Sequence, residues 1–350
     1  MSKKILVTGG CGYIGSHTIV DLIEKGFQVV CLDNLSSADE SALEGIRSIT
    51  GKQVTNYKVD LCDSKTLSKV FEEHLDLAGI VHFAALKSVG DSVFDPLLYY
   101  QNNITGLINL LECAQTYRIR HFIFSSSCSV YGNSDELPVT EQTPLKEAES
   151  PYARTKQMGE AIIRDFARVN PNFDAIILRY FNPAGAHLSA IIGESPTNPA
   201  NNLVPVITET AIGKRKEMIV FGDDYDTRDG SCIRDFIHVM DLADAHSKAL
   251  QYILVDANDT NFEVFNLGTW DGISVLEAIR AFENVNDIKL NYRIGPRREG
   301  DVIAVYADRS LAHQKLGWEP QYSIESIMLS AWKWEQRRSQ KIAAETLVDR

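Results

Sequence analysis

A glycine-rich turn close to the start of the chain constrains the fold more than any other feature of the sequence. The apolar run at residues 4–8 leads directly into residues 9–15, which read Gly-Gly-Cys-Gly-Tyr-Ile-Gly. Residues 16–25 have the pattern of a helix, and residues 27–32 that of a second buried strand that ends in Asp33. Glycines in such a turn let backbone amides approach a pyrophosphate at the helix N-terminus. The pattern therefore predicts a dinucleotide-binding unit.

The acidic residue at the end of the second strand indicates which dinucleotide is bound. Asp33 follows Gly15 by 18 residues, where a carboxylate can accept a hydrogen bond from an adenosine ribose hydroxyl. A carboxylate at this position would also repel a 2′-phosphate. We therefore predict NAD, rather than NADP, as the cofactor.

The alternation of strands and helices continues to about residue 180. Further strands are predicted at residues 54–59, 79–83, 121–124 and 175–178, and further helices at 65–74, at 96–117 and from Pro151 onward. Residues 37–40, Ser-Ala-Asp-Glu, have the form of a capping box that opens one more helix. Strands that alternate with helices indicate a doubly wound parallel sheet, so the predicted fold class is α/β and Rossmann-like.

Beyond residue 180 this alternation weakens. A loop is expected at residues 186–202, helices at 203–212, 239–252 and 274–282, and strands at 218–221 and 262–267. We predict an NAD-binding Rossmann domain at residues 1–180 and a smaller mixed α/β substrate-binding domain at 181–350, with returns of the chain to the sheet. The polar tail from Gln336 carries no pattern from which its order can be predicted.

Charge and cysteine usage exclude several classes of function. The chain has 35 Lys and Arg against 47 Asp and Glu, a net charge of -12, which disfavours binding of nucleic acid. The six cysteines form no C-x-x-C pair, and the eight histidines lack metal-ligand spacing, so no metal site is expected. No secretory leader and no apolar run of membrane length are recognised. We expect a cytoplasmic protein with reduced thiols and no membrane partner.

A Tyr-x-x-x-Lys pair marks the candidate catalytic helix. Pro151 suits the first position of a helix, and Tyr152 and Lys156 then share one face. A cation held near a phenol favours the phenolate, so Tyr152 is predicted to be a general base with a lowered pKa. The alternative is an exposed helix on which the spacing is accidental. Against it, the glycine turn, Asp33 and the Tyr152 helix all follow strand ends, where ligands of such sheets bind.

Together these motifs give the sequence a specific resemblance. Thr8-Gly9-Gly10-x-Gly12-x-x-Gly15, Ser127 and Tyr152-x-x-x-Lys156 resemble the extended short-chain dehydrogenase/reductase superfamily. Within it, the chain from residue 4 to about residue 334 is similar to the UDP-glucose (UDP-galactose) 4-epimerases. That similarity rests on residues 179–187 (Arg-Tyr-Phe-Asn-Pro-Ala-Gly-Ala-His), 201–203, 234–239 and 297–301.

The resemblance assigns roles to individual residues. It implies that Ser127 and Tyr152 bracket the sugar 4-hydroxyl, and that Lys156 binds the nicotinamide ribose. Residues predicted to contact NAD are Gly9, Gly12, Tyr13, Ile14, Gly15, Asp33, Asn34, Asp60, Leu61, Phe83, Ala84, Ala85, Lys87, Asn102, Ser127, Tyr152, Lys156 and Phe181. Residues predicted to contact the UDP-hexose are Ser127, Ser129, Tyr152, Phe181, Asn182, Asn202, Leu203, Ile219, Val220, Phe221, Arg234, Arg298, Asp301 and Val305.

The implied reaction is a transient oxidation at the sugar 4-position that interconverts UDP-glucose and UDP-galactose. Arg234 and Arg298 are fork-shaped donors suited to a diphosphate. A nucleotide-sugar 4,6-dehydratase is a rival, but such enzymes place Asp-Glu after the active-site hydroxyl residue, where this chain has Cys128 and Ser129. A second rival is a catalytically inactive NAD-binding sensor or scaffold, although the chain keeps the hydroxyl, phenol and ammonium groups.

Two further expectations follow from the resemblance. Val305 lies where some family members carry a tyrosine beside the sugar 2-position, so room for an acetamido group and acceptance of UDP-GlcNAc and UDP-GalNAc are predicted. The alternative is a valine that only packs a strand. The family is usually homodimeric through a four-helix contact, to which the helices near Pro96 and Pro151 could contribute.

Overall fold

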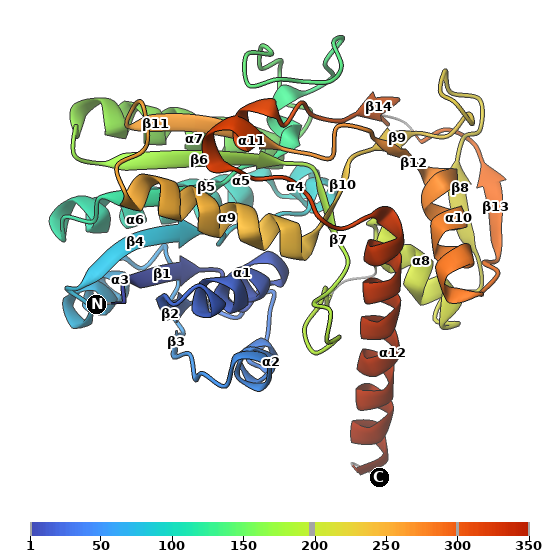
Figure 1. The fold of residues 1–350 in the computed structure, drawn as a ribbon, viewed down its shortest axis with the longest axis horizontal. Coiled ribbons are helices and arrows are strands. Elements are labelled where there is room, and N and C mark those ends of the chain that lie inside the picture. The colour runs from blue at the N-terminus through green and yellow to red at the C-terminus, as the bar shows by residue number, and fades with distance from the viewer. Residues whose placement is uncertain (1, 196–199, 299–300, 349–350) are drawn as a thin grey trace.

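The computed structural model describes residues 2–195, 200–298 and 301–348, with side chains described up to residue 341. Two parts lie side by side in Figure 1. One is a large sheet with helices on both faces, and the other is a smaller group of helices and strands beside the long C-terminal helix. In the described residues no helix is both long and apolar enough to cross a membrane.

The large sheet has seven strands in the order β11-β6-β5-β4-β1-β2-β3, and all six pairings are parallel. Its strands are β1 (Lys4–Thr8), β2 (Gln28–Leu32), β3 (Asn56–Tyr57), β4 (Leu77–His82), β5 (His121–Ser125), β6 (Asp174–Tyr180) and β11 (Phe262–Leu267). The chain starts in the middle of the sheet, builds one side, and then crosses to build the other. The predicted α/β, Rossmann-like class is confirmed.

Helices cover the two faces of this sheet with separate apolar cores. On one face α1 (Tyr13–Glu24), α2 (Ser41–Thr50) and α9 (Val239–Leu254) contribute to a core with β1, β4 and β6. On the other face α3 (Ser64–Glu73), α6 (Gly106–Thr116) and α7 (Pro151–Val169) do the same. Because β4, β5 and β6 are buried almost throughout, their sequences read as continuous apolar runs.

The helix predicted at residues 96–117 is present but interrupted. It consists of α5 (Pro96–Tyr100), a π-helical turn (Gln101–Thr105) and α6. Inside the π turn, the Asn103 side chain accepts from the Leu86 amide (2.8 Å), donates to the Leu86 carbonyl (3.0 Å) and donates to Thr155 Oγ1 (3.1 Å). The widened turn therefore ties the loop after β4 to α7, a use of π turns common near functional sites.

The capping box predicted at residues 37–40 is wrong. Helix α2 begins only at Ser41, and the Asp39 carboxylate accepts from the Ser41 amide (2.7 Å) in a local turn before the helix. A capping box occurs instead at the start of α10 (Val275–Asn286), where Ser274 and Glu277 exchange both bonds. An Asp two residues after the Ser offers the backbone a competing partner, which explains the failed prediction.

The second part of the molecule packs around α8 (Leu203–Ala211), α10 and α12 (Ile324–Val348), with a core of its own. Strands β8 (Met218–Phe221) and β13 (Tyr292–Gly295) form a parallel pair beside them. Helix α9 and strand β11, although they come late in the chain, pack with the large sheet. The division of the chain into domains near residue 180 stays a proposal.

Short elements join the two parts. Strands β7 (Asn182–Ala184) and β10 (Phe236–His238) pair in parallel, and β9 (Ile233–Arg234) lies between β12 (Ile273–Ser274) and β14 (Ala304–Val305). Three further short helices are α4 (Val89–Phe94), the 3-10 turn Cys128–Tyr131 and α11 (Ser310–Leu316). Neither α11 nor β13 nor the helical tail of α12 was predicted.

Candidate active site

The glycine turn has the backbone geometry that a dinucleotide requires. Gly9 has a φ of +68°, and a Cβ there would lie 2.7 Å from the Ala84 amide nitrogen. A Cβ on Gly15 would lie 2.2 Å from the Gly9 carbonyl oxygen. Gly12 is the N-cap of α1 and offers no side chain to the first helical amides, which leaves them to face an anion. The turn therefore fits a pyrophosphate.

Asp33 is buried at the end of β2 and is held in place by two amides. Its carboxylate accepts from Cys11 N (3.0 Å) and from Leu35 N (2.9 Å). Burial raises the pKa of Asp33, while these amides act in the opposite direction. Beside it, the Asn34 amide donates to the Asp60 carboxylate (3.3 Å). Three of the predicted NAD contacts, Asp33, Asn34 and Asp60, thus lie together.

The loop after β4 completes the predicted cofactor site. Phe83 N donates to the Thr8 carbonyl (3.0 Å), so this loop starts beside the glycine turn. Phe83, Ala84 and Ala85 are half-buried, whereas Lys87 is exposed, with its Nζ 3.6 Å from Glu194. Of the remaining predicted NAD contacts, Tyr13, Ile14 and Asn102 are half-buried, and Leu61 and Phe181 are buried.

Helix α7 presents the predicted catalytic pair as the sequence indicates. Pro151 is its first residue, and the Ser150 hydroxyl caps it by accepting from Ala153 N (3.1 Å). Lys156 is buried, and its Nζ donates to the Ser125 carbonyl (2.7 Å) and lies 5.9 Å from the centre of the Tyr152 ring. The structure therefore brings Tyr152 and Lys156 to the carboxyl end of β5.

Ser127 lies two residues beyond the end of β5, beside Tyr152. Its Oγ accepts from Ser129 N (3.2 Å) and from Ser129 Oγ (3.0 Å). A hydrogen bond between Ser127 and the Tyr152 phenol acts to lower the pKa of Tyr152. Because both Ser129 groups donate to it, the Ser127 hydroxyl proton points elsewhere and can be donated to a ligand. Ser129 thus orients Ser127.

The residues of the protein chain alone do not lower the pKa of Tyr152, so the predicted general base needs a further positive charge beside the phenol. Burial raises the pKa of Tyr152 above its ordinary value, the neighbouring Tyr180 adds to this, and the Ser127 hydrogen bond only partly opposes it. Burial also lowers the pKa of Lys156 to about 8, against the attraction of Glu160. Spacing along the helix indicated the partner correctly, but it could not reveal the desolvation of both groups.

A buried polar network supports α7 from behind. Arg179 on β6 pairs with Glu160 on α7 through two hydrogen bonds, Nε to Oε1 (2.9 Å) and Nη2 to Oε2 (2.6 Å). Glu160 also accepts from Ser126 Oγ (2.6 Å), and Arg179 donates to the Tyr131 hydroxyl (3.0 Å). Sequence reasoning missed Glu160. Its place one helical turn after Lys156, on the buried face, was the available signal.

Some of the residues predicted to hold a UDP-sugar lie on the short strands between the two parts. Arg234 on β9 is paired with Val305 on β14. Its Nη1 donates to the Val302 carbonyl (2.7 Å), and its Nη2 lies 3.6 Å from the Asp301 carboxylate. Arg298 donates to the same Asp301 oxygen (2.6 Å). Two guanidinium groups therefore converge on one carboxylate, while Glu299 and Gly300 lie outside the described residues.

Other predicted substrate residues differ in what they can offer. Asn182, which begins β7, has a buried side-chain nitrogen, Nδ2, without a hydrogen-bond partner among the described residues, as expected of a group that awaits a ligand. The Arg298 guanidinium lies 5.3 Å from the centre of the exposed Phe221 ring. The Val220 side chain is buried in the second core, so only its backbone can meet a ligand, and a side-chain contact there is excluded.

Asn202 and Leu203 lie at the start of α8, further along the same side. Asn202 is exposed, and its amide lies 3.4 Å from Glu194 Oε1. Leu203 is half-buried and packs against the second core, and Ile219 on β8 is half-buried as well.

Asp235 is, after Glu160, the other buried carboxylate near the site that sequence reasoning missed. It accepts from Thr269 N (2.8 Å), Thr269 Oγ1 (2.6 Å) and Ala307 N (3.1 Å). Its backbone carbonyl accepts from Asn182 N (2.9 Å). Asp235 therefore holds β7, β9 and the segment after β14 in register, next to Arg234. Its position immediately after Arg234 was the signal.

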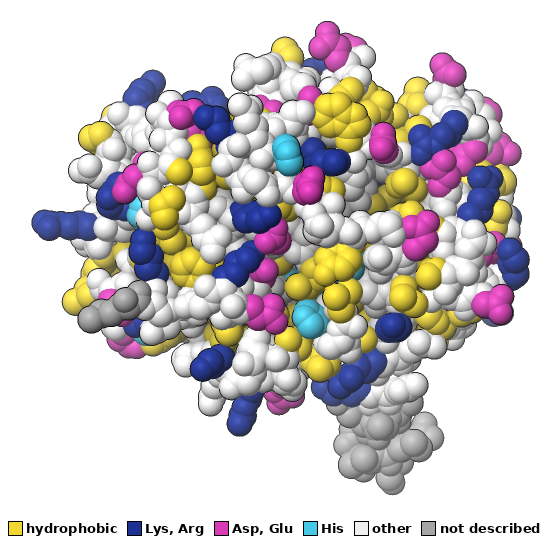
Figure 2. Space-filling model, viewed as in Figure 1, with side chains coloured by type: hydrophobic (Ala, Val, Ile, Leu, Met, Phe, Trp, Pro, Cys, Tyr) yellow, Lys and Arg dark blue, Asp and Glu magenta, His cyan; other side chains and the backbone are white. Residues whose placement is uncertain are grey.

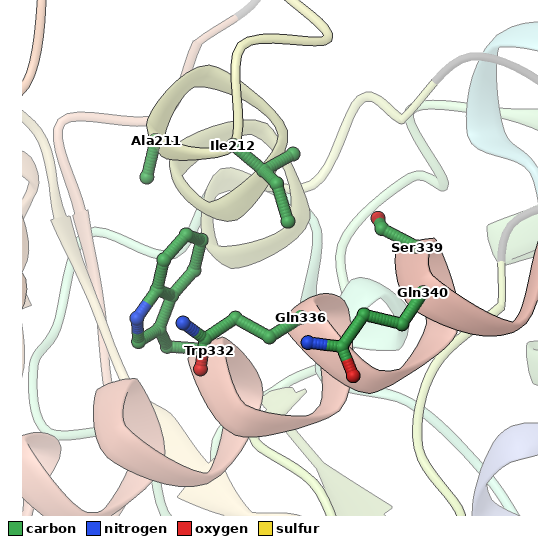
Figure 3. A pocket seen from close by; sticks show the side chains of 6 residues that line it. All are labelled: Ala211, Ile212, Trp332, Gln336, Ser339 and Gln340. Carbon is green, nitrogen blue, oxygen red and sulfur yellow. The ribbon is translucent and has the colours of Figure 1, made fainter. Parts of the chain in front are cut away.

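Three other features of the molecule bear on ligand binding: a surface cavity, the distribution of charge and the placement of possible metal ligands. A cavity of about 470 Å³ lies between α8 and α12. Figure 3 shows its lining by Ala211, Ile212, Trp332, Gln336, Ser339 and Gln340. Charges of both signs are interspersed over the face in Figure 2. Within the described parts of the chain, no three His, Cys, Asp or Glu side chains gather in a way that could hold a metal ion.

A parallel sheet with this glycine turn and a Ser-Tyr-Lys set at its strand ends defines an enzyme of the extended short-chain dehydrogenase/reductase type. The model of the family described as GDP-mannose 4,6 dehydratase matches residues 6–330. UDP-glucose 4-epimerase of Bacillus subtilis (strain 168) is 46% identical over 331 residues, which cover 95% of this chain and 96% of the relative. The chain belongs to the UDP-glucose 4-epimerase family.

Solved structures agree with this assignment. A UDP-glucose 4-epimerase from Stenotrophomonas maltophila, with bound NAD and formylated UDP-arabinopyranose, superimposes with a TM-score of 0.93 at 43% identity. It covers 97% of this chain and 99% of its own. The UDP-Glc/GlcNAc 4-epimerase from Campylobacter jejuni has a TM-score of 0.83 at 39% identity and covers 96% and 100%.

Proposed function

We propose that this protein is an NAD-dependent epimerase that interconverts UDP-glucose and UDP-galactose at the sugar 4-position. The observation that carries the proposal is the convergence of Ser127, Tyr152 and Lys156 beside the glycine turn, at the carboxyl ends of β1 and β5. A base, a hydroxyl donor and a cation at a dinucleotide site are the groups that reversible alcohol oxidation needs.

The fit of the cofactor residues supports NAD. The amides of the turn would hold the pyrophosphate, Asp33 would accept from the adenosine ribose, and Lys156 would bind the nicotinamide ribose. When bound, NAD supplies a positively charged ring that accepts a hydride and returns it. Because the cofactor is regenerated in each cycle, we expect it to stay bound between turnovers.

The residues around the sugar would then move one proton. Tyr152 takes the proton of the 4-hydroxyl, and Ser127, whose oxygen already accepts from Ser129, keeps its own proton and donates a hydrogen bond to the 4-oxygen. Lys156 is fixed by the Ser125 carbonyl and stabilises the Tyr152 phenolate. Inversion requires the 4-ketone to turn within the pocket before Tyr152 returns the proton. Arg234 and Arg298 bind the diphosphate, exchanging part of their contact with Asp301.

The chemistry of the neighbouring positions argues against dehydration, despite the description of the matched family model. Elimination of water needs an acid and a base beyond the hydroxyl residue. Cys128 occupies the first of those positions, and burial raises its pKa to about 12. A thiol that stays protonated is a poor base, and Ser129 is engaged with Ser127. Epimerisation is therefore the better supported reaction.

Acceptance of the N-acetylhexosamine substrates is a finer part of the proposal. Val305 is half-buried on β14, opposite Arg234, and packs against the cluster that contains Phe181 and Tyr131. Its short side chain supports room for a 2-acetamido group, and the C. jejuni relative is named for both substrates. We expect UDP-GlcNAc to be epimerised as well.

A homodimer is supported by an apolar surface on one side of the sheet. Val93, Phe94 and Leu97 on α4 and α5 are 59, 90 and 76% exposed, and Met158 on α7 is 37% exposed. Helices α4 and α5 both pack against α7, so these side chains share one side of the molecule. Its occupant would be the same face of a second copy. The six free cysteines are in keeping with a reducing, cytoplasmic location.

The deciding experiment incubates purified protein, without added cofactor, with UDP-glucose and separately with UDP-GlcNAc, and resolves the products by chromatography. Formation of UDP-galactose establishes epimerisation with retained NAD, and UDP-GalNAc establishes the wider specificity. Absence of a 4-epimer from either substrate, even with NAD supplied, would refute the function. Static light scattering on the same sample tests the homodimer.

A further inference from the structure

Two cysteine side chains meet beneath the glycine turn. Cys11 lies within the turn and Cys31 near the end of β2, and their Sγ atoms are 3.8 Å apart. Both are free thiols, 5% and 0% exposed. The epimerase reaction as derived above uses neither of them.

The pair is mechanically connected to the predicted adenosine site. The Cys11 amide donates to the Asp33 carboxylate (3.0 Å), and Cys31, in β2, precedes Asp33 by two residues, with Asp33 just beyond the end of that strand. A Cβ on Gly10 would lie only 2.6 Å from Cys31 Sγ, so the turn rests directly on this sulfur. Movement of either sulfur therefore moves the turn, Asp33 or both.

We propose that Cys11 and Cys31 form a modification site, at which a low-molecular-weight disulfide converts the pair into an intramolecular disulfide that weakens dinucleotide binding. The proposal rests on the proposed function in so far as the turn binds NAD. Cys11 Sγ attacks one sulfur of the reagent and releases one thiol. Cys31 Sγ then displaces the second thiol from Cys11. Two protein thiols are oxidised, one disulfide reagent is reduced, and both thiol protons leave with the released thiols.

Geometry indicates which part must give way. A disulfide requires the two sulfurs to approach to about 2.05 Å, a little more than half of the present 3.8 Å between the Sγ atoms. Cys31 is fixed because β2 is hydrogen-bonded to β1 on one side and to β3 on the other. Cys11 lies between β1 and α1 and belongs to no strand or helix, so the turn is the part that moves, and the bond from its amide to Asp33 is lost.

Burial determines when the reaction can occur. The contact with Cys11, with burial adding to it, raises the pKa of the Cys31 thiol, and the thiolate is the reactive form. Oxidation therefore requires the turn to open locally. A dinucleotide lying on the turn opposes that opening, so bound NAD protects the thiols and the oxidised turn excludes NAD.

The test compares full-length protein saturated with NAD and the same protein stripped of dinucleotide, both treated with oxidised glutathione. After alkylation, peptide mass spectrometry locates the disulfide, and titration measures NAD affinity before oxidation, after it, and after reduction with dithiothreitol. We expect a Cys11–Cys31 disulfide in the stripped protein, formation at least tenfold slower with NAD, and a reversible loss of affinity of at least tenfold.

Matched variants separate this site from the other thiols. Cys31→Ala and, independently, Cys11→Ala should keep their NAD affinity after oxidation, whereas Cys113→Ala, in α6, should lose it as the parent does. Failure to find the Cys11–Cys31 peptide, or a disulfide that leaves NAD affinity unchanged, would overturn the inference. Reduced protein that binds no NAD would refute the proposed function instead, and peptide mapping would still decide whether the thiols join.

Discussion

Among single side chains, desolvation outweighs pairing in setting the charge around Tyr152. Burial raises the pKa of Tyr152 and lowers that of Lys156 to about 8, so each group is pushed toward its neutral form. The polar contacts of Lys156 and Ser127 are nevertheless already in place. The proposed phenolate would therefore find these contacts in place, and a bound positive charge is what would favour its formation.

Removal of the Tyr152 hydroxyl tests the proposed role of this residue as the general base. Tyr152→Phe should lower kcat by about 10²–10⁴-fold, the usual contribution of a general base, while leaving NAD bound. Turnover of UDP-glucose and absorbance of the retained cofactor measure the two effects. Tyr117→Phe, which removes a hydroxyl bonded to Ser68 far from the site, is the control. A kcat for Tyr152→Phe within threefold of the parent would contradict the role.

Residue size at position 305 gives a second prediction. Val305→Tyr should depress turnover of UDP-GlcNAc by at least tenfold and leave that of UDP-glucose within about threefold, because the added ring would occupy the space beside the sugar 2-position. Val305→Ala, which keeps that space, should retain both activities. Equal losses on both substrates would show that Val305 only packs β14.

For the helices and strands, predictability followed the environment of each element. Strands β4 to β6 and helix α7 were predicted because burial imposes apolar runs and Pro151 marks a start. Strand β13 was not, since its residues are mostly exposed and only pairing with β8 makes it a strand. The π turn after α5 has no local sequence pattern, because it arises from the tertiary contacts of Asn103. The site residues were reachable through motifs, whereas the support of Glu160 and Asp235 depends on contacts distant in sequence.

The junction of α7 with β6 supports a stability prediction. Glu160→Gln should lower the free energy of unfolding by about 3–5 kcal/mol, because it leaves the Arg179 charge buried without its partner. Both side chains are at most 3% exposed. Urea unfolding measures the change. Asp76→Asn, which breaks the more exposed pair with Lys4, is the matched control and should have little effect. Equal effects of the two substitutions would contradict the structural role of the buried pair.

For the molecule as a whole, buried histidines couple stability to pH. Burial lowers the pKa of six histidines, to about 3 for His17 and His82 and about 4 for His238 and His246, and it also lowers the pKa of His121 and His187. In the unfolded chain each returns to about 6.5. The stability they provide is therefore present above pH 6.5 and is lost as pH falls toward 4, since unfolding then takes up protons. Four carboxylates whose pKa burial raises oppose this slope but are fewer than the six histidines: Asp33, Glu141, Asp235 and Asp241, the last two with a pKa of about 6.

The free energy of unfolding should consequently fall as pH is lowered from 6.5 to 4. His246→Asn should reduce that slope by roughly one proton, or about 1.4 kcal/mol per pH unit, because asparagine can still donate to the Leu242 carbonyl that His246 Nδ1 contacts at 2.8 Å but does not titrate. Urea unfolding at half-unit pH intervals measures both. His313→Asn, at an exposed position, should leave the slope as it is, since that ring meets solvent in both states. An unchanged slope in His246→Asn would mean that the acid sensitivity of the fold resides in its carboxylates rather than in the histidines buried along the sheet.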